Sequence, residues 1–182
     1  TFQKFVEDIE ESIKIFKNKL GYNPIYFSYP FGEYNLEQKN YISNNFEFAF
    51  GQHSGVIDLN KDRYELPRFP INEKYGEIKR FKEVISYLPL QYKIIKPENK
   101  FMNDGENPPK MTIEFFEDQK NLENINCFSN EGSKWRKTKI ILNDNILNIN
   151  FSEKFIERRG RINCSLKDEN GWRFSGFQFV QN

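Results

Sequence analysis

Apolar side chains recur at two different spacings along this chain. Over residues 2–20 they fall three or four positions apart, at Phe2, Phe5, Ile9, Ile13, Phe16 and Leu20. Such spacing places them on one face of a helix, with charged residues on the other. The helix should end at Gly21, because glycine readily forms a C-cap and Pro24 follows as a helix breaker.

Two short strands are predicted next, with a helix between them. Residues 25–27 favour a strand that stops at Pro30, since proline cannot donate a hydrogen bond to a sheet. Asn35 and Gln38 have the spacing of a capping box and predict a new helix. Residues 46–50 alternate between phenylalanine and other residues, which is typical of a strand. A strand, helix and second strand favour a parallel sheet, as in a barrel or a doubly wound sheet.

The second half of the chain has a different texture. A last amphipathic helix is expected over residues 78–88, followed by a proline-rich and asparagine-rich connector at 89–108. Beyond it lie short β-prone runs at 110–116, 125–129, 135–142, 146–151, 160–166 and 172–180. These runs predict a small antiparallel β-sandwich. We therefore expect an α/β domain at 1–88, a linker at 89–108 and a sandwich at 109–182.

Composition narrows the classes of partner. The chain of 182 residues has 27 basic and 26 acidic residues, so its charge gives no case for nucleic acid or an anionic membrane surface. No apolar run approaches the roughly 20 residues that a membrane span requires. Aromatic residues make up 16% of the chain, and most should be core, including Trp135 and Trp172, although stacking on sugar rings is an alternative. The oligomeric state is not predicted.

The two cysteines, Cys127 and Cys164, both fall in the β-rich tail. With a single histidine in the chain they cannot supply a four-ligand zinc site. Either a disulfide, as in an exported protein, or two buried thiols would suit their positions.

Three segments, taken in order, carry a resemblance to a known family. They are Tyr29-Pro30-Phe31-Gly32-Glu33-Tyr34, then residues 48–55 (FAFGQHSG) and residues 66–70 (LPRFP). In order and spacing they resemble the later part of the NodB-type polysaccharide deacetylases, carbohydrate esterase family 4. The resemblance covers about residues 1–87 and, more loosely, the β-rich tail.

The resemblance implies a distorted (β/α) barrel that removes acetyl groups from a polysaccharide with a metal-bound water and an aspartate base. In the family the metal, zinc or a similar divalent ion, is held by an aspartate and a His-x-x-x-His pair. This chain has no Thr-Phe-Asp-Asp segment and one histidine. Those elements precede the Pro-aromatic-Gly motif in the family, so we expect a truncated barrel that binds no metal and turns over no substrate by itself.

The same resemblance assigns roles at the motif. It implies that the backbone amide of Phe31 helps to hold the tetrahedral oxyanion, and that Tyr29, Pro30 and Gly32 form a wall of the substrate groove. Many family members have arginine where Ser28 stands, which puts that contact in doubt. Without the resemblance, the motif is a Pro-Gly turn that ends a strand.

His53 and Arg68 are the remaining candidates. His53 lies past the end of the second predicted strand, so in a parallel sheet it should share a pocket with Phe31 and act there as an acid. A hydrogen-bonded loop histidine is the alternative, since its context differs from that of the family's late histidine. Arg68 could orient a carboxylate, or form a structural salt bridge with Glu33 or Glu65.

The sequence is thus interpreted as the C-terminal part of an extracellular or periplasmic polysaccharide deacetylase acting on an acetylated glycan. A non-catalytic carbohydrate-binding or cell-surface protein with a barrel remnant is the alternative. A glycoside hydrolase would need two carboxylates across a sugar site, and no pair is convincingly placed.

Overall fold

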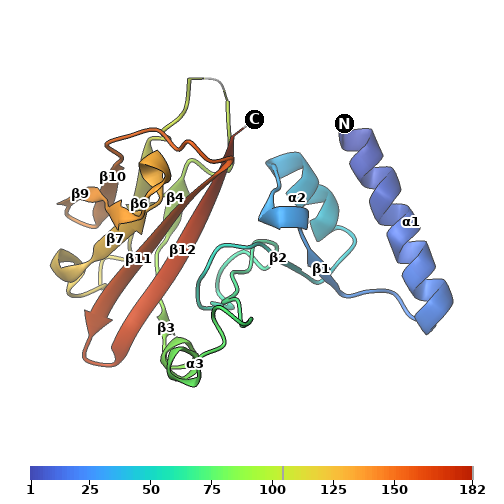
Figure 1. Cartoon of the computed structure of the whole chain (residues 1–182), viewed down its shortest axis with the longest axis horizontal. Helices are drawn as coiled ribbons and strands as arrows, with labels where there is room; N and C mark the ends of the chain where they lie inside the picture. Colours follow the sequence, from blue (N-terminus) through green and yellow to red (C-terminus); the bar gives the residue numbers. More distant parts are fainter. Residues whose placement is uncertain (104, 182) are drawn as a thin grey trace. The chain divides into compact units, whose positions relative to one another are not determined.

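The computed structural model of the chain describes residues 1–103 and 105–181, which fall into two compact units. The first, here the N-terminal unit, comprises residues 1–52 and 59–66. The second, the C-terminal unit, comprises residues 53–58 and the chain from Pro67 onward. Figure 1 labels the elements of both. None of the described helices is long and apolar enough to cross a membrane.

The N-terminal unit contains the elements that the sequence predicts. Helix α1 (Phe2–Leu20) ends at Gly21, whose φ of 83° is the left-handed C-cap conformation. Helix α2 (Leu36–Ser43) begins with the predicted capping box, in which Asn35 and Gln38 bond reciprocally. The two helices pack through aromatic contacts of Phe2 and Phe5 with Tyr41.

The two strands of this unit are parallel, as predicted. Strand β1 (Tyr26–Ser28) pairs with β2 (Phe48–Phe50), and Phe27 lies opposite Ala49. Leu66 adds an isolated parallel bridge to Phe50. The described residues form a mixed α/β structure without a closed barrel.

The C-terminal unit is built on two sheets. Four strands pair in the order β4-β6-β10-β9, and five in the order β3-β12-β11-β7-β8, with β5 pairing to β12. Their bounds are β3 Leu88–Pro89, β4 Ile94–Lys96, β5 Phe101–Met102, β6 Met111–Glu114, β7 Asn126–Ser129, β8 Arg136–Lys137, β9 Lys139–Asn143, β10 Ile146–Asn150, β11 Arg159–Asp168 and β12 Gly171–Gln181. The long β11–β12 hairpin, red in Figure 1, dominates the unit.

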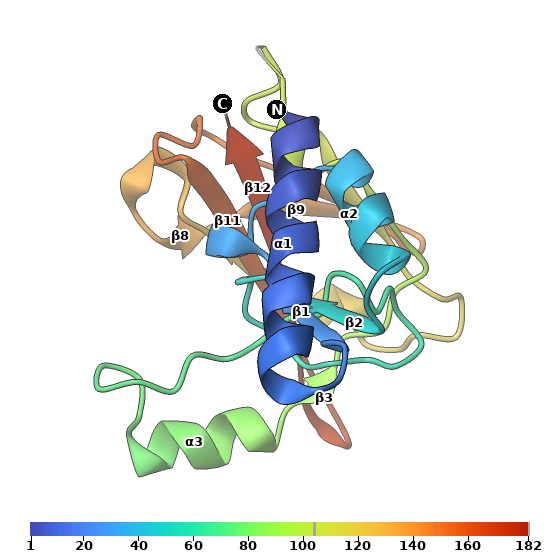
Figure 2. The same ribbon diagram turned by 90° about the vertical axis from the view of Figure 1, so that its right-hand side faces the viewer.

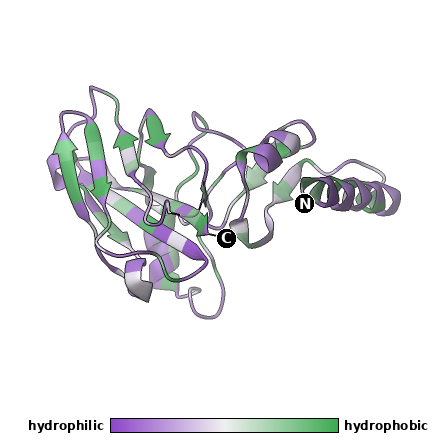
Figure 3. Ribbon diagram, turned by 90° about the horizontal axis from the view of Figure 1, so that it is seen from above, coloured by the Kyte–Doolittle hydropathy of each residue, from purple (hydrophilic) through white to green (hydrophobic). Residues whose placement is uncertain are grey.

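Both sheets contribute side chains to one core. Ile113 and Leu147 come from the four-stranded sheet, and Ile162 and Phe179 from the other. In Figure 3 hydrophobic colour recurs along the strands of the C-terminal unit, whereas the helix at the N-terminus is largely hydrophilic. Cys127 and Cys164 lie directly opposite each other on β7 and β11 and form a disulfide, which decides between the two alternatives for the cysteines.

Residues 78–108 differ from the prediction. Helix α3 (Ile78–Ile85) is shorter than expected, because Leu88 and Pro89 form strand β3 beside β12 (Figure 2). The expected linker at 89–108 contains β4 and β5, which pair with strands of the C-terminal unit. Hydrogen bonding to distant strands thus overrides the loop-like composition of this segment, which belongs to the C-terminal unit.

The tryptophans were expected in the core and are not there. Trp135 is 53% exposed and Trp172 is 46% exposed. Trp172 lies on the outward row of β12, near the tip of the β11–β12 hairpin. The inward rows of these strands are filled instead by residues such as Ile162, Leu166 and Phe177.

Candidate functional site

The Pro-aromatic-Gly motif forms a tight turn at the carboxyl end of β1. Residues Pro30–Gly32 make one 3-10 turn, in which the Gly32 N–H donates to Tyr29 O at 2.9 Å and the Glu33 N–H to Pro30 O at 3.1 Å. Phe31 has a φ of 57° and its side chain is 64% exposed. A left-handed phenylalanine costs on the order of 1–3 kcal/mol, so the surrounding structure must impose this conformation.

Gly32 brings this turn against the residue that follows β2. A Cβ on Gly32 would lie 2.5 Å from Gln52 N and 2.7 Å from Gln52 Cβ, and Gly32 itself has a φ of +68°. Only glycine fits both the space and the backbone conformation. The tips after β1 and β2 thus meet at one edge of the parallel pair, which is where α/β proteins commonly bind ligands.

Tyr29 fixes the turn from beneath. Its side chain is only 2% exposed, stacks on Tyr34 with ring centroids 4.3 Å apart, and donates from its hydroxyl to Tyr64 O at 3.0 Å. Buried in this way, the Tyr29 ring is part of the core rather than a surface of the groove wall. Of the assigned groove residues, Pro30 is exposed and Gly32 is buried.

A charged cluster behind the motif ties α2 to residues 59–66. Lys39 Nζ lies 2.7 Å from Asp62 Oδ2 and 3.3 Å from Glu65 Oε2, and the Tyr34 hydroxyl donates to the same Glu65 oxygen at 3.2 Å. Here this group is called the Lys39 cluster: Lys39, Asp62, Glu65 and Tyr34.

The ionisation of the Lys39 cluster suits a structural role. Burial lowers the pKa of Lys39, but the charges and hydrogen bonds of Glu65 and Asp62 outweigh it, so the pKa is raised overall. Burial, and then the Glu65 charge, hold the pKa of Tyr34 well above its ordinary value. Burial likewise raises the pKa of Tyr29. Lys39 is therefore charged and both tyrosines are neutral donors near neutrality.

His53 and Arg68 lie in the C-terminal unit, where their backbones are joined. The Arg68 N–H donates to His53 O at 3.1 Å. His53 is half-buried and the Arg68 side chain is exposed. Glu65, one of the two acids considered as an ion-pair partner for Arg68, binds Lys39 and Tyr34. The structure thus brings His53 and Arg68 together, and separately Tyr29, Pro30, Phe31 and Gly32.

The residues at the motif do not fit a divalent metal. Asp62 and Glu65 already share an ion pair with Lys39. Within residues 1–103 and 105–181, no group of three or more histidine, cysteine, aspartate or glutamate side chains is placed to hold a metal ion.

Sequence reasoning missed the Lys39 cluster and the burial of Tyr29. The contacts join residues 23 to 35 positions apart, and no local pattern marks such pairs.

Comparison with known proteins gives no relative for this arrangement. No family model matches the chain, and no curated protein or solved structure is significantly similar to it.

Proposed function

We propose that this chain is the C-terminal part of a polysaccharide deacetylase, which hydrolyses N- or O-acetyl groups on a glycan. The N-terminal unit would be the last portion of a (β/α) barrel and the C-terminal unit an appended β-sandwich. The observation that supports this most is the Pro30–Gly32 turn. It combines the family's Pro-aromatic-Gly sequence with an exposed, left-handed Phe31 at the carboxyl edge of a parallel strand pair.

Each residue of the turn has a role in this proposal. The Phe31 N–H would donate to the oxyanion that develops on the acetyl carbonyl oxygen, where a fixed amide stabilises charge without reorganisation. Pro30 and the exposed Phe31 ring offer an apolar wall to the sugar. Gly32 lets the turn approach Gln52, and the Tyr29–Tyr34 stack holds it from below.

The metal and the general base are supplied by residues upstream of Thr1 in this proposal. The bound divalent ion would lower the pKa of a water and neutralise charge. The coding sequence that precedes Thr1 should therefore encode an aspartate-rich strand end and a His-x-x-x-His pair. A preceding sequence with neither would overturn the proposal.

Two glycine substitutions, made in the protein extended upstream of Thr1, test the role of the turn. Gly32→Ala should lower kcat for deacetylation at least about tenfold, because a Cβ would push the turn away from Gln52 and displace the Phe31 amide. Gly21→Ala is the matched control, since Gly21 also has positive φ but no atom within 4 Å of its Cβ position. Equal kcat values for the two variants would contradict the role given to the turn.

A further inference from the structure

The sheet that contains β11 and β12 has one buried and one outward row of side chains. On β11 every second residue from Gly160 to Leu166 is buried, and the residues between them are not. Residues opposite each other in antiparallel strands point to the same face of a sheet. The register therefore defines an outward face: the alternate residues of β11 from Arg159 to Lys167, with Asn126 and Phe128 of β7, Lys137 of β8 and Trp172 of β12.

The charged side chains of the outward face all have the same sign. They are Arg159, Arg161 and Lys167 on β11 and Lys137 on β8. No acidic residue occupies an outward position of β7, β8, β11 or β12, four strands that the structure describes from end to end. The chain as a whole has 27 basic and 26 acidic residues, so its charges are unevenly distributed, and this surface attracts anions.

Two aromatic rings are exposed on the same face. Phe128 is 43% exposed and Trp172 is 46% exposed. Lys167 Nζ lies over the Trp172 ring, 5.8 Å from its centroid, so a positive charge adjoins this ring. Asn163 and Ser165 lie on β11 between the levels of the two rings and offer uncharged hydrogen-bonding groups. The outward face therefore combines cations, aromatic rings and neutral polar side chains.

Arg161 is held in place on the outward face. Its Nε–H donates to Gln178 Oε1 at 3.2 Å, and Gln178 is itself buried. The two Nη groups form the end of a fork that matches a carboxylate. Burial, and then the Arg159 charge, lower the pKa of Arg161, while Glu157 and Tyr75 act in the opposite sense. A bound anion would offset both of the unfavourable contributions.

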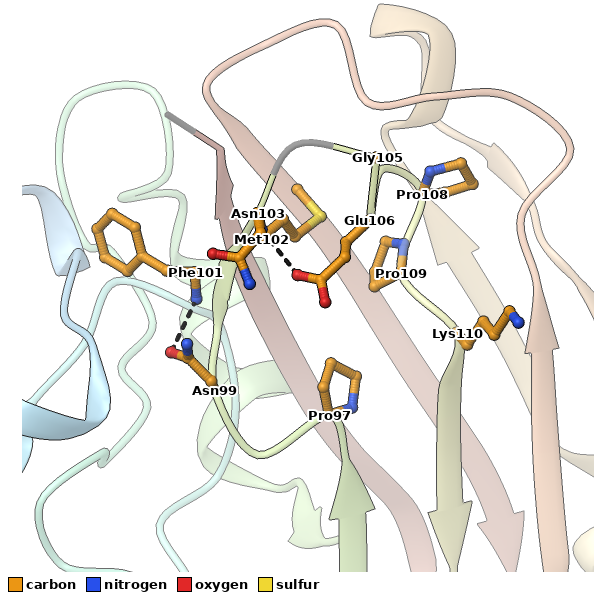
Figure 4. A pocket seen from close by; sticks show the side chains of 10 residues that line it. All are labelled: Pro97, Asn99, Phe101, Met102, Asn103, Gly105, Glu106, Pro108, Pro109 and Lys110. Atoms are coloured by element: carbon orange, nitrogen blue, oxygen red, sulfur yellow. Dashed lines mark hydrogen bonds between the residues drawn. The ribbon is translucent and has the colours of Figure 1, made fainter.

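The cavity lined by residues between Pro97 and Lys110 is a separate feature of the C-terminal unit. Its lining includes β5, which pairs with the last residues of β12, whereas Trp172 is near the first. In Figure 4 the Glu106 carboxylate lies on the same side as the Pro97 and Pro109 rings. The basic outward face does not include this cavity.

Two classes of polyanion suit cations placed beside aromatic rings. They are single-stranded nucleic acids and acidic polysaccharides. The disulfide of Cys127 and Cys164 joins two strands of this same sheet, and disulfides persist in oxidising environments outside the cytosol. Acidic polysaccharides are common in such environments and nucleic acids are not. The disulfide and the carboxylate-matching fork of Arg161 therefore favour a polysaccharide.

We propose that the outward face binds a polysaccharide that carries carboxylate groups. Arg161, Lys137 and Lys167 bind the carboxylates, and sugar rings pack on Phe128 and Trp172. The site does not depend on the deacetylase proposal, because the C-terminal unit supplies all of these groups. In a deacetylase it would hold the polymer at a second point and raise its local concentration.

The test is a titration of the ¹⁵N-labelled 182-residue chain with the hexamer of α-1,4-linked galacturonic acid, followed by amide chemical shifts at low ionic strength. The methyl-esterified hexamer, which keeps the rings but has no charge, and a single-stranded thymidine oligonucleotide of equal charge are titrated in parallel. We expect saturable shifts of amides in residues 126–128, 137 and 161–167 with the acid. The ester should bind about tenfold or more weakly, because it forms no charge-assisted hydrogen bonds, and the oligonucleotide should also bind less tightly than the acid.

Two double variants test which cations are responsible. Lys137→Gln/Lys167→Gln removes two exposed charges from the outward face and should weaken binding of the acid hexamer about tenfold. Lys96→Gln/Lys110→Gln removes two exposed charges from β4 and from the residue before β6, in the other sheet, and should leave the affinity unchanged.

Four results would overturn the proposal for the outward face. They are the absence of saturable shifts with the acid hexamer, equal affinities for the acid and the ester, equal affinities of the two double variants, and tighter binding of the oligonucleotide at the same amides. The last result would assign the face to nucleic acid. Shifts confined to residues 29–33 would also overturn it, while supporting the groove assigned to the deacetylase.

Discussion

The two units of this chain are stabilised in different ways. The N-terminal unit has two three-residue strands and a core of six buried side chains, and polar contacts of Tyr29, Tyr34 and Lys39 join its parts. The C-terminal unit has strands of 10 and 11 residues, a core of sixteen buried side chains and a disulfide. The unit that carries the candidate catalytic turn is thus the one with less apolar burial. Its geometry depends on specific long-range contacts.

The disulfide should have the largest single effect. Replacing both Cys127 and Cys164 with alanine removes a covalent link between positions 37 residues apart in the sequence. Native disulfides of this kind typically contribute about 2–5 kcal/mol to the free energy of unfolding. Hydrogen exchange should show faster opening of β7 and β11 in the variant, with little change in α1. Equal acceleration in α1 and β11 would show that the two units unfold together.

Removing the buried carboxylate of Glu131 should have the next largest effect on the free energy of unfolding. Glu131 is 1% exposed, and its Oε2 accepts from the Ser152 N–H at 2.6 Å and the Glu153 N–H at 3.0 Å. Glu131→Ala leaves both donors without their acceptor and should lower the free energy of unfolding by about 1–3 kcal/mol in urea titration. Glu169→Ala, at an exposed position, is the control and should change stability little. Equal effects of the two substitutions would contradict this role for Glu131.

In the N-terminal unit, Lys39→Met should lower the free energy of unfolding by about 1–2 kcal/mol, because Asp62 and Glu65 lose their shared counter-ion. The pKa of Lys39 is raised above its ordinary 10.5. Its contribution to stability is therefore complete below about that pH and is lost as the pH rises through the raised value.

Hydrogen exchange of the α2 amides, measured as the pH is raised, checks that the contribution of Lys39 to stability is lost at high pH. The unaltered chain should lose protection in α2 above pH 10.5, and Lys39→Met should lack that step. Arg63→Met, an exposed substitution near the cluster, should keep it. An alkaline step of the same size in Lys39→Met would mean that other groups hold residues 59–66.

The smallest effect is expected at the tip of the β11–β12 hairpin. A hydrogen bond from Arg173 holds the pKa of Asp168 below its ordinary value. Its contribution is present above pH 3.8, the ordinary value, and is lost as the pH falls through the lowered one. Asp168→Asn should lower the free energy of unfolding by less than about 1 kcal/mol at pH 7. The effect should be much smaller at a pH low enough to protonate Asp168 in both the folded and the unfolded chain. A larger cost at acid pH than at pH 7 would reverse this assignment.

Local patterns in the sequence predicted the elements well and their tertiary environment poorly. The capping box at Asn35, the C-cap at Gly21 and the parallel pairing of β1 and β2 were all predicted, because short-range spacing encodes them. The roles of Leu88 and Pro89 in β3 and the exposure of Trp135 were not. Both depend on which distant strand lies alongside, which no neighbouring residue specifies.

The candidate site likewise contains features that the sequence predicted and features that it did not. The turn at Pro30–Gly32 was predicted from proline and glycine, whereas the left-handed φ of Phe31 and the approach of Gly32 to Gln52 depend on tertiary packing. The burial of Tyr29 reflects its contact with Tyr64, 35 residues away. A single sequence carries no signal for that pair.

The most direct measurement is acetate release from the trimer of N-acetylglucosamine by the protein extended upstream of Thr1. The account predicts metal-dependent release of acetate, lost on treatment with a chelator and restored by zinc. A folded extended protein that retains the Pro30–Gly32 turn, is supplied with zinc or a similar divalent ion, and releases no acetate from this or other acetylated glycans would contradict it.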